Sequence, residues 1–544
     1  MSGLSFPSSS RELLRRLADE GVQLYLKEGR LHYSARRGAA TPEVLRVLAA
    51  RRAELEELLR LAAPAHHGVA ERPPMTASGA TDGELSYAQE RLWFEEQVAP
   101  GSPRYNVPVV VRIAGPLDVA ALAWSLTEVS RRHAALRTTF RRGADGRPRQ
   151  VVGPVEPVAL ERTEAPAEAP ADWVAAWVAA DARVGFDIER GPLWRGRIAQ
   201  VGPGVWVVQL TLHHLVTDAW SMGVLLRDVT ALYEARVHGR AAGLAPLRGQ
   251  YLDYAQWQRQ WLRGAVLDEA VGYWRQQLAG LDDRLRLPPD AAGGAAAGAL
   301  LPFTWAAGVS EAIRRLGRER GATLFMLLVA GLAVVLGRRL GARDVAVGAD
   351  VANRTIAEVE ELIGFFVNLV VLRVDLRGAP TFAEVVERVR ATVLGANAHQ
   401  DVPFDRVVDE LQPPRVAGRT PLFQVLLVMQ HAPLPALQLD GLALTPVPAD
   451  TGTAKFELAL FIRDTPGGIQ GTWNYRTDLF RPETVQAVTR QLEQVLVAAA
   501  ADPTIAIETL SLADAPGQVP VTSPRPLSAS TRRPMSFTEE TTAS

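Results

Sequence analysis

The chain of 544 residues is long enough for two or three domains. Its formal net charge of -1 gives no overall field for nucleic acid or an anionic membrane. The absence of cysteine excludes disulfides, thiolate metal sites and a cysteine nucleophile. The N-terminus lacks the apolar stretch of a secretory signal, and the longest apolar run, residues 322–336, is shorter than the roughly 18 residues of a membrane span. We therefore expect a cytoplasmic protein.

Residues 1–61 are expected to form a helix-hairpin-helix unit. Leucines recur at helical spacing between Arg11 and Asp19, and Thr41-Pro42-Glu43 is a typical helix start. Between these helices, alternating apolar residues predict two strands joined by a turn at residues 27–29. A unit of this size buries little core, so its expected role is to bind a partner. The candidate partner-binding residues are Val22, Leu24, Leu26, Leu31 and Tyr33.

Residues 62–83 are rich in alanine, proline, glycine and threonine and are expected to be a linker. Residues 84–513 alternate between strand and helix patterns over two halves, at about 84–280 and 300–513, which indicates an α/β or α+β fold. The segment Arg286–Pro302 is the expected crossover, and the proline-, serine- and threonine-rich tail 514–544 is expected to be flexible. The expected strands are Val109–Ile113, Val205–Leu212, Val345–Val351, Leu369–Leu376, Leu422–Met429, Phe456–Ile462 and Ile469–Tyr475. The expected helices are Val119–His133, Ala219–Ala235, Glu311–Arg318, Thr323–Arg339, Phe382–Asn397 and Glu483–Ala500.

The segment Thr211–Gly223 carries the most chemical information. His213 and His214 end an expected strand, and Asp218 begins an expected helix four residues later. Adjacent strand residues face opposite sides of a sheet, so the two histidines cannot share one site while the strand continues. His214 prolongs an unbroken apolar row, which predicts a desolvated histidine suited to acid–base chemistry. That row consists of Trp206, Val208, Leu210 and Leu212.

Other interpretations of this segment stay open. Asp218 is also a natural helix cap, and a buried structural histidine pair is nearly as consistent with the residues as a catalytic one. A metal site is disfavoured because the strand directs the two histidines apart, so we expect no metal. The sequence has no phosphate-binding loop, and Ser221 falls inside the expected helix without the nucleophile-elbow pattern. ATP activation and a serine-bound acyl intermediate are therefore not expected.

The pattern His213-His214-x-x-x-Asp218 resembles the signature of the condensation-domain family of non-ribosomal peptide synthetases. Companion motifs of that family occur in the right order, and the resemblance covers roughly residues 84–513. Residues 1–61 resemble the TubC-type N-terminal docking domains that begin some synthetase subunits. The companion motifs span residues 85–94, 132–140, 251–257, 352–354, 363–368, 399–404 and 421–425.

The resemblance implies two chloramphenicol-acetyltransferase-like lobes in a V with a tunnel between them. It associates the second histidine, His214, with catalysis and gives Asp218 a structural role held by an arginine. Arg354 is the expected partner and Arg137 the alternative. Ala219 stands where the family usually has glycine, so its methyl group could slow the enzyme or narrow its substrate range. Asn368 belongs to the motif at 363–368 and is a further candidate supporting residue.

The activity implied by the resemblance is acyl transfer without a bound cofactor. Donor and acceptor arrive as thioesters on the phosphopantetheine of carrier proteins, and the acceptor amine attacks the donor to form an amide. The motifs look most like the subfamily that joins an L-donor to an L-acceptor. The docking unit is expected to bind the synthetase protein that precedes it in the line and could mediate dimerisation. The alternatives are a non-catalytic recruitment platform and an enzyme that uses a soluble amine or alcohol.

Overall fold

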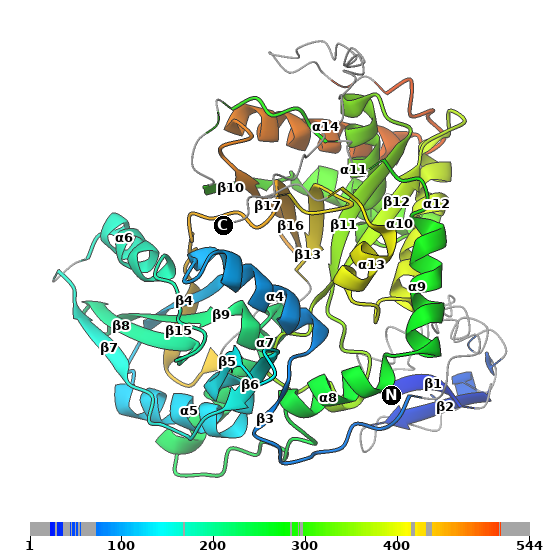
Figure 1. Ribbon diagram of the computed structural model, residues 1–544. Coiled ribbons are helices and arrows are strands. Elements are labelled where there is room, and N and C mark those ends of the chain that lie inside the picture. Colours follow the sequence, from blue (N-terminus) through cyan, green and yellow to red (C-terminus); the bar gives the residue numbers. More distant parts are fainter. Residues whose placement is uncertain are drawn as a thin grey trace, which may run out of the picture. The chain divides into compact units, whose positions relative to one another are not determined.

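The computed structural model describes residues 22–27, 30–35, 44, 46–48, 51, 52, 55, 72–166, 169–282, 286–291, 293, 297–414, 419–430, 438–510 and 512. Between residues 72 and 512 the chain forms two six-stranded sheets with helices packed against them (Figure 1). The α-helices in this range are α4 (Tyr87–Val98), α5 (Val119–Arg132), α6 (Ala171–Ala182), α7 (Ala219–Val237), α8 (Tyr251–Trp261), α9 (Ala265–Gln277), α10 (Ala307–Arg320), α11 (Leu324–Leu340), α12 (Phe382–Ala398), α13 (Phe404–Leu411) and α14 (Pro482–Ala501).

The first sheet has the strand order β14-β15-β4-β9-β8-β7. Helices cover both of its faces: α5 and α7 share one apolar cluster with β9, and α6 shares another with it. Two of its strands, β14 and β15, come from the C-terminal half of the chain, and β15 pairs antiparallel with β4. The strands are β4 (Asn106–Ala114), β7 (Leu160–Glu164), β8 (Trp194–Gly202), β9 (Val205–His213), β14 (Gln438–Leu439) and β15 (Leu442–Pro446).

The second sheet has the order β10-β17-β16-β13-β11-β12 and combines parallel and antiparallel pairs. A smaller sheet, β3-β6-β5, lies in the N-terminal half of the chain. The strands of the second sheet are β10 (Gly298–Thr304), β11 (Asp344–Val351), β12 (Asn368–Asp375), β13 (Val425–Met429), β16 (Leu458–Thr465) and β17 (Gly468–Arg476). Those of the smaller sheet are β3 (Asp82–Glu84), β5 (Thr138–Arg142) and β6 (Pro148–Val152).

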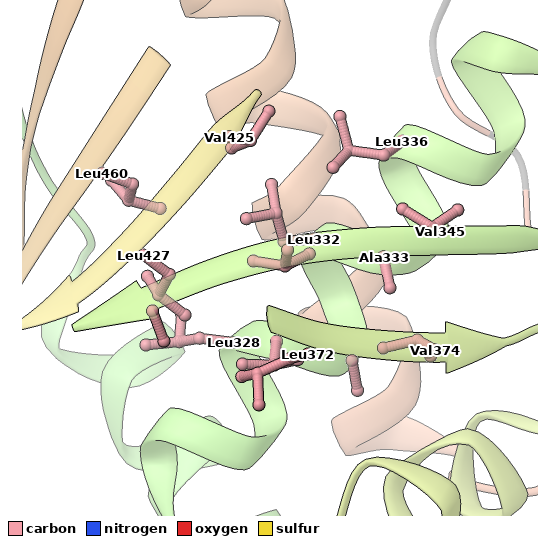
Figure 2. Close-up of a cluster of buried hydrophobic side chains, with 14 of the residues drawn as sticks. Leu328, Leu332, Ala333, Leu336, Val345, Leu372, Val374, Val425, Leu427 and Leu460 are labelled. Atoms are coloured by element: carbon pink, nitrogen blue, oxygen red, sulfur yellow. The ribbon is translucent and has the colours of Figure 1, made fainter. Parts of the chain in front are cut away.

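Helix α11 is the centre of the largest core. Its residues from Met326 to Gly337 are all buried, because β11 and the helices α10, α12 and α14 surround it. Figure 2 shows Leu328, Leu332 and Leu336 of α11 among apolar side chains of β11, β12, β13 and β16. A helix that is apolar on every side is stable only inside a protein, so this long apolar run forms the scaffold behind the second sheet.

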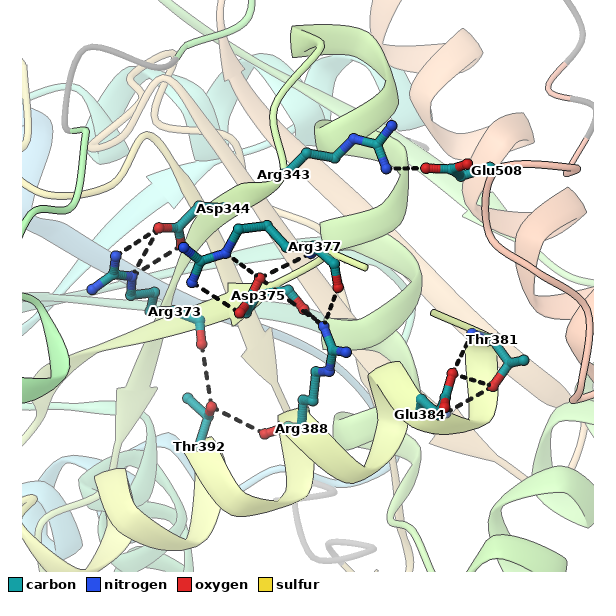
Figure 3. Close-up of polar contacts among 10 residues, drawn as sticks. All are labelled: Arg343, Asp344, Arg373, Asp375, Arg377, Thr381, Glu384, Arg388, Thr392 and Glu508. Atoms are coloured by element: carbon teal, nitrogen blue, oxygen red, sulfur yellow. Dashed lines mark hydrogen bonds and ion pairs between the residues drawn. The ribbon is translucent and has the colours of Figure 1, made fainter. Parts of the chain in front are cut away.

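Polar contacts surround the start of β11, the end of β12 and the start of α12 (Figure 3). Arg373 on β12 binds Asp344 at the start of β11, and Asp375 binds Arg377. Helix α12 begins at Phe382 because Thr381 and Glu384 form a capping box: the Thr381 hydroxyl caps the Glu384 amide, and the Glu384 carboxylate accepts the Thr381 amide. These half-buried and exposed contacts lie where β11, β12 and α12 begin or end.

The mixed α/β architecture is confirmed, and every strand and helix expected between residues 84 and 513 is present, although several ends differ. Strand β4 begins at Asn106 and not at Val109, helix α10 begins at Ala307 and not at Glu311, and β16 extends to Thr465 and not only to Ile462. Two further corrections have a physical reason or change an element. Strand β13 begins at Val425 and not at Leu422, because Leu422 has a left-handed backbone with φ 70° that a strand does not accommodate. The segment expected to be only a crossover ends in a strand, since β10 begins at Gly298 and pairs along β17. The pairing of β15 with β4 was not predicted.

In the first 61 residues the expected hairpin is present. Strands β1 (Val22–Lys27) and β2 (Arg30–Ala35) pair antiparallel, with Leu24 opposite Tyr33 and Leu26 opposite Leu31. The expected helix at 11–19, most of the linker, the tail and the side chains of the candidate partner-binding residues other than the half-buried Leu31 lie outside the described residues. Of the later helix, the side chains of Val44, Leu48 and Leu55 are buried.

In the parts of the chain that the structure describes, no single helix is long and apolar enough to cross a membrane. Helices α10 and α11 together have the length and composition of a membrane span, but they are bent by 105° at the break between them.

Candidate functional site

The two signature histidines belong to different elements. Strand β9 ends at His213, and His214 opens the short 3-10 helix His214–Val216 that leads to α7. The expectation that His214 continues the apolar row of β9 was wrong. Both faces of β9 are covered by helices, so Val207 and Thr211 on the other row are fully buried as well. Alternation along the strand therefore does not select between the histidines.

His213 is buried, and both nitrogens of its ring have hydrogen-bond partners. Its Nδ1 accepts a hydrogen bond from the Leu215 amide at 3.2 Å, so the proton of the neutral ring lies on Nε2. Nε2 is 3.1 Å from Oε1 of Glu96 on α4, and only 1% and 3% of the two side chains are exposed. The rings of Tyr105 and Phe186 flank the imidazole edge to face. His213 thus ties the signature to α4 and has both ring nitrogens occupied.

His214 has one occupied and one available ring nitrogen. Its Nδ1–H donates to the Thr217 carbonyl oxygen at 2.7 Å, and its ring packs edge to face on Phe365 at 4.9 Å. Within the described residues Nε2 makes no hydrogen bond, and the side chain is only half-buried. Burial, followed by the positive charge of Lys455, lowers the pKa of His214 well below 6.5. The imidazole is therefore neutral at pH 7 with a free lone pair on Nε2.

Asp218 is fully buried and joins two halves of the chain. It caps α7 by accepting the Ser221 amide at 2.7 Å, and it accepts the Phe366 amide at 3.0 Å. Its Oδ1 also lies 3.3 Å from Nη2 of Arg354, the partner expected first. The alternative partner was wrong: Arg137 donates instead to the carbonyl oxygens of Ser130 and Gly153.

Arg354 holds several groups at once. Its Nη1 donates to the Val359 and Leu362 carbonyls, and its Nη2 donates to the Ser221 hydroxyl at 2.8 Å as well as to Asp218. Its guanidinium lies 4.0 Å from the centroid of the Phe366 ring. Burial lowers its pKa, and the Asp218 carboxylate opposes this effect. The arginine therefore fixes the loop 354–366 against the start of α7.

The close approach of this loop requires glycine at position 364. A Cβ atom there would lie 1.8 Å from the Tyr251 ring, which is impossible without displacement. Tyr251 donates to the Phe365 carbonyl and shares a 2.8 Å hydrogen bond with Ser86 at the start of α4. Three of the sequence motifs thus meet here and hold the Phe365 ring against His214.

Two further candidate residues, Ala219 and Asn368, have roles that their own contacts and backbone define. Ala219 is the first residue of α7, is exposed and has no left-handed backbone, so the helix start does not need glycine at this position. The Asn368 side chain donates to the Gln400 and Val402 carbonyls and accepts the Phe404 amide. Asn368 therefore shapes the loop before α13.

Sequence reasoning missed three residues around the signature: Glu96, Tyr105 and Lys455. Glu96 lies on the buried face of α4 together with Gln89, Leu92 and Trp93. The helical spacing of these residues could have indicated a buried acid that needs a partner. Lys455 was detectable as one of only two lysines among 59 lysine and arginine residues. Tyr105 gave no signal in the sequence.

Across the residues with described side chains, no group of three or more histidine, aspartate or glutamate side chains is placed to hold a metal ion. The site is built from one free imidazole nitrogen, a buried ion pair and one nearby lysine.

Comparison with known proteins gives two family matches. Residues 80–518 match the condensation domain, and residues 11–60 match the TubC N-terminal docking domain. A linear gramicidin synthase protein of Brevibacillus parabrevis is 40% identical over 436 residues, which are 79% of this chain but 6% of that protein. The chain thus spans a small fraction of the length of this relative.

Two solved structures share the fold. The X-domain in complex with OxyB from teicoplanin biosynthesis has a TM-score of 0.73 and 31% identity, over 82% of this chain and 99% of that chain. The first condensation domain of the calcium-dependent antibiotic synthetase, solved with a substrate analogue, has a TM-score of 0.68 and 22% identity, over 80% and 100% of the two chains. The chain therefore belongs to the condensation-domain family of non-ribosomal peptide synthetases and carries a TubC-type docking domain ahead of it.

Proposed function

We propose that this chain forms an amide bond between two substrates that carrier proteins deliver as phosphopantetheine thioesters. The observation that carries the proposal is the free Nε2 of His214. Its Nδ1 is held by the Thr217 carbonyl, so the ring cannot turn away from the site without losing that hydrogen bond. A neutral imidazole in this state accepts a proton from, or a hydrogen bond of, an acceptor amine.

In the proposed reaction the acceptor amine attacks the donor thioester carbonyl. Nε2 of His214 orients the amine and receives its proton, and the proton then passes to the departing phosphopantetheine sulfur. The Asp218–Arg354 pair keeps α7 and the loop 354–366 together, which preserves the geometry around His214. Bringing two tethered reactants together contributes to the rate independently of proton transfer. No acyl group becomes attached to the enzyme.

The docking domain is proposed to recruit the preceding synthetase protein of the line through the hairpin β1–β2. An extended peptide that added to an edge of this hairpin would gain main-chain hydrogen bonds. An L-configured donor and acceptor, a cytoplasmic location and dimerisation through the docking domain are part of the same proposal.

A second candidate function is recruitment of a tailoring enzyme without catalysis. It is favoured by the similarity to the X-domain that was solved in complex with OxyB. The free nitrogen of His214 favours the enzyme, because a pure docking surface has no need of a histidine with one free, deprotonated nitrogen. The two functions make opposite predictions for a transfer assay.

The deciding experiment loads a donor carrier and an acceptor carrier with different aminoacyl thioesters and adds the full chain. Intact-protein mass spectrometry then follows the donor mass onto the acceptor. Transfer that needs the folded protein supports condensation. No transfer across several donors, with a carrier-bound, a soluble amine and a soluble alcohol acceptor, would instead support the recruitment platform.

The protonation state of His214 gives a separate prediction. With 13C-labelled histidine, the His214 signal is expected to stay at its neutral position as the pH falls through 6.5, because the folded-state pKa is lowered by burial and by Lys455. The unfolded chain binds this proton near pH 6.5. His214 therefore reduces stability progressively as the pH falls from 6.5 toward its folded pKa. The His214→Gln variant assigns the signal, because the His214 resonance is the one that it lacks. A titration midpoint of that signal at or above pH 6.5 contradicts this prediction.

A further inference from the structure

Lys455 is an unusual cation for this chain, which relies almost wholly on arginine for positive charge. It lies on the segment that leaves β15 in the first sheet at Pro446 and enters β16 in the second sheet at Leu458. The segment therefore joins the two sheets, and its lysine side chain is half-buried.

Contacts of Lys455 lead through Tyr105 to His213, and its charge acts on His214. Its carbonyl oxygen accepts a 2.6 Å hydrogen bond from Arg104, which fixes the backbone near the start of β4. Its Nζ lies 5.5 Å from the centroid of the Tyr105 ring, and that ring lies 6.3 Å from the His213 ring. Among the charged side chains of the described residues, Lys455 has the largest electrostatic effect on His214.

The Lys455 ammonium lies near two other positive charges, those of Arg104 and Arg91. No carboxylate in the described part of the chain forms an ion pair with it, and the acids near its neighbours are engaged: Glu95 pairs with Arg104 at 3.7 Å, and Asp405 lies 4.0 Å from Arg91. Burial, followed by the positive charges of Arg104 and Arg91, lowers the pKa of Lys455 to about 7. At neutral pH Lys455 is therefore partly protonated, and the protonated fraction has no carboxylate partner among the described residues.

Moving the unpaired Lys455 ammonium out of water costs free energy when the chain folds. The interaction of the ammonium with the Tyr105 ring offsets only part of that cost. An arginine at this position would also supply a positive charge, but it would carry that charge permanently, because a guanidinium cannot release its proton in a protein. A desolvated lysine exists partly without its proton near neutral pH and regains it when a negative charge forms nearby. A lysine at this position is therefore suited to a site where negative charge appears only during the reaction.

We infer that Lys455 stabilises the negative charge that forms on the donor carbonyl oxygen when the acceptor amine attacks; this inference rests on the proposed condensation. The amine nitrogen bonds to the carbonyl carbon, and the carbonyl π electrons move onto oxygen, opposite the Lys455 ammonium. The C=O bond then reforms as the C–S bond breaks. One amine proton leaves through His214 and ends on the thiol of the departing carrier.

The test compares Lys455→Met with wild type in the transfer assay under steady-state conditions. A lost direct oxyanion donor typically lowers kcat by about 10²–10³-fold. For Lys455→Met we expect a decrease of roughly 10- to 100-fold in kcat, with KM for both carriers within about twofold, since the interaction exists only in the transition state. Lys455→Arg is expected to recover most of the loss. Arg463→Met, which removes an exposed cation that bonds Gln430 on the same half of the chain, is the matched control and should transfer like wild type.

A readout independent of activity is the 13C titration of His214. Removing the ammonium should raise the His214 pKa, since the ammonium opposes protonation of the imidazole. An unchanged pKa in a folded Lys455→Met protein would overturn the inference. So would an unchanged kcat, a Lys455→Arg variant no better than Lys455→Met, or a loss confined to KM for acidic substrates, which would make Lys455 a specificity residue. If wild type itself transfers nothing, the proposed function fails, while the titration still reports whether Lys455 acts on His214.

Discussion

Replacing His214 by alanine is expected to lower the rate of transfer between carriers by about 10²–10⁴-fold, the usual range for loss of a general base. The variant should remain folded, because His214 is half-buried and its hydrogen bond to Thr217 is its one polar contact among the described residues. Residual transfer is expected, since carriers that hold both substrates together still provide proximity. The measurement is single-turnover transfer followed by intact-protein mass spectrometry.

Two conservative variants separate proton removal from positioning. His214→Asn keeps a donor near the Thr217 carbonyl but removes the Nε2 position, and should be as slow as His214→Ala. His214→Gln places an amide oxygen near the position of Nε2, where it can orient an amine but cannot take its proton. A Gln variant within about tenfold of wild type would show that His214 positions the amine and does not act as a base. His238→Ala, at an exposed histidine after α7, is the control.

Replacing Arg354 by methionine is expected to destabilise the protein by about 3–5 kcal/mol, the range for breaking one side of a buried ion pair. The reason is that the fully buried Asp218 would lose its ion-pair partner, while the Val359 and Leu362 carbonyls would lose their donor. Urea unfolding followed by tryptophan fluorescence measures the loss. Transfer activity should fall as well, since the loop that carries Phe365 would no longer be fixed against α7.

Arg137→Met provides a matched comparison for this effect. Among the described residues Arg137 binds two carbonyl oxygens and no carboxylate, so its removal leaves no partner charge unpaired there and should destabilise the protein by about 1–3 kcal/mol. The double variant Asp218→Asn with Arg354→Met should lose less unfolding free energy than the sum of the two single losses. Removing both partners leaves neither one charged without the other. Additive losses would contradict a direct coupling between Asp218 and Arg354.

The fold was predictable where one element carries its own pattern. Helix α11 is apolar from Leu324 to Gly337, and α5 and α7 each follow an aspartate cap, so the limits of these helices were predicted within about two residues. Strand β15 could not be predicted in the same way. It is a five-residue strand whose partner, β4, lies more than 300 residues earlier in the chain, and local propensity contains no information on that pairing.

The site was predicted in its chemistry but only partly in its geometry. Resemblance identified the motif, and the structure pairs Asp218 with Arg354 as expected. Alternation along β9 gave a wrong reason for choosing His214, because it assumed a sheet with one buried face, whereas α6 covers the second. The partner of His213, Glu96, required knowing that α4 packs beside the end of β9, which is a tertiary contact.

The pairing of β15 with β4 has a consequence for attempts to divide or recombine this protein. An N-terminal half cut before residue 300 would lack β14 and β15, and the outer edge of β4 would expose unpaired amide and carbonyl groups. Such an edge is a template for association with other chains, so the isolated half is expected to aggregate. A chimera that exchanges one half must therefore transfer residues 438–446 together with the N-terminal sheet, although they are far apart in the sequence.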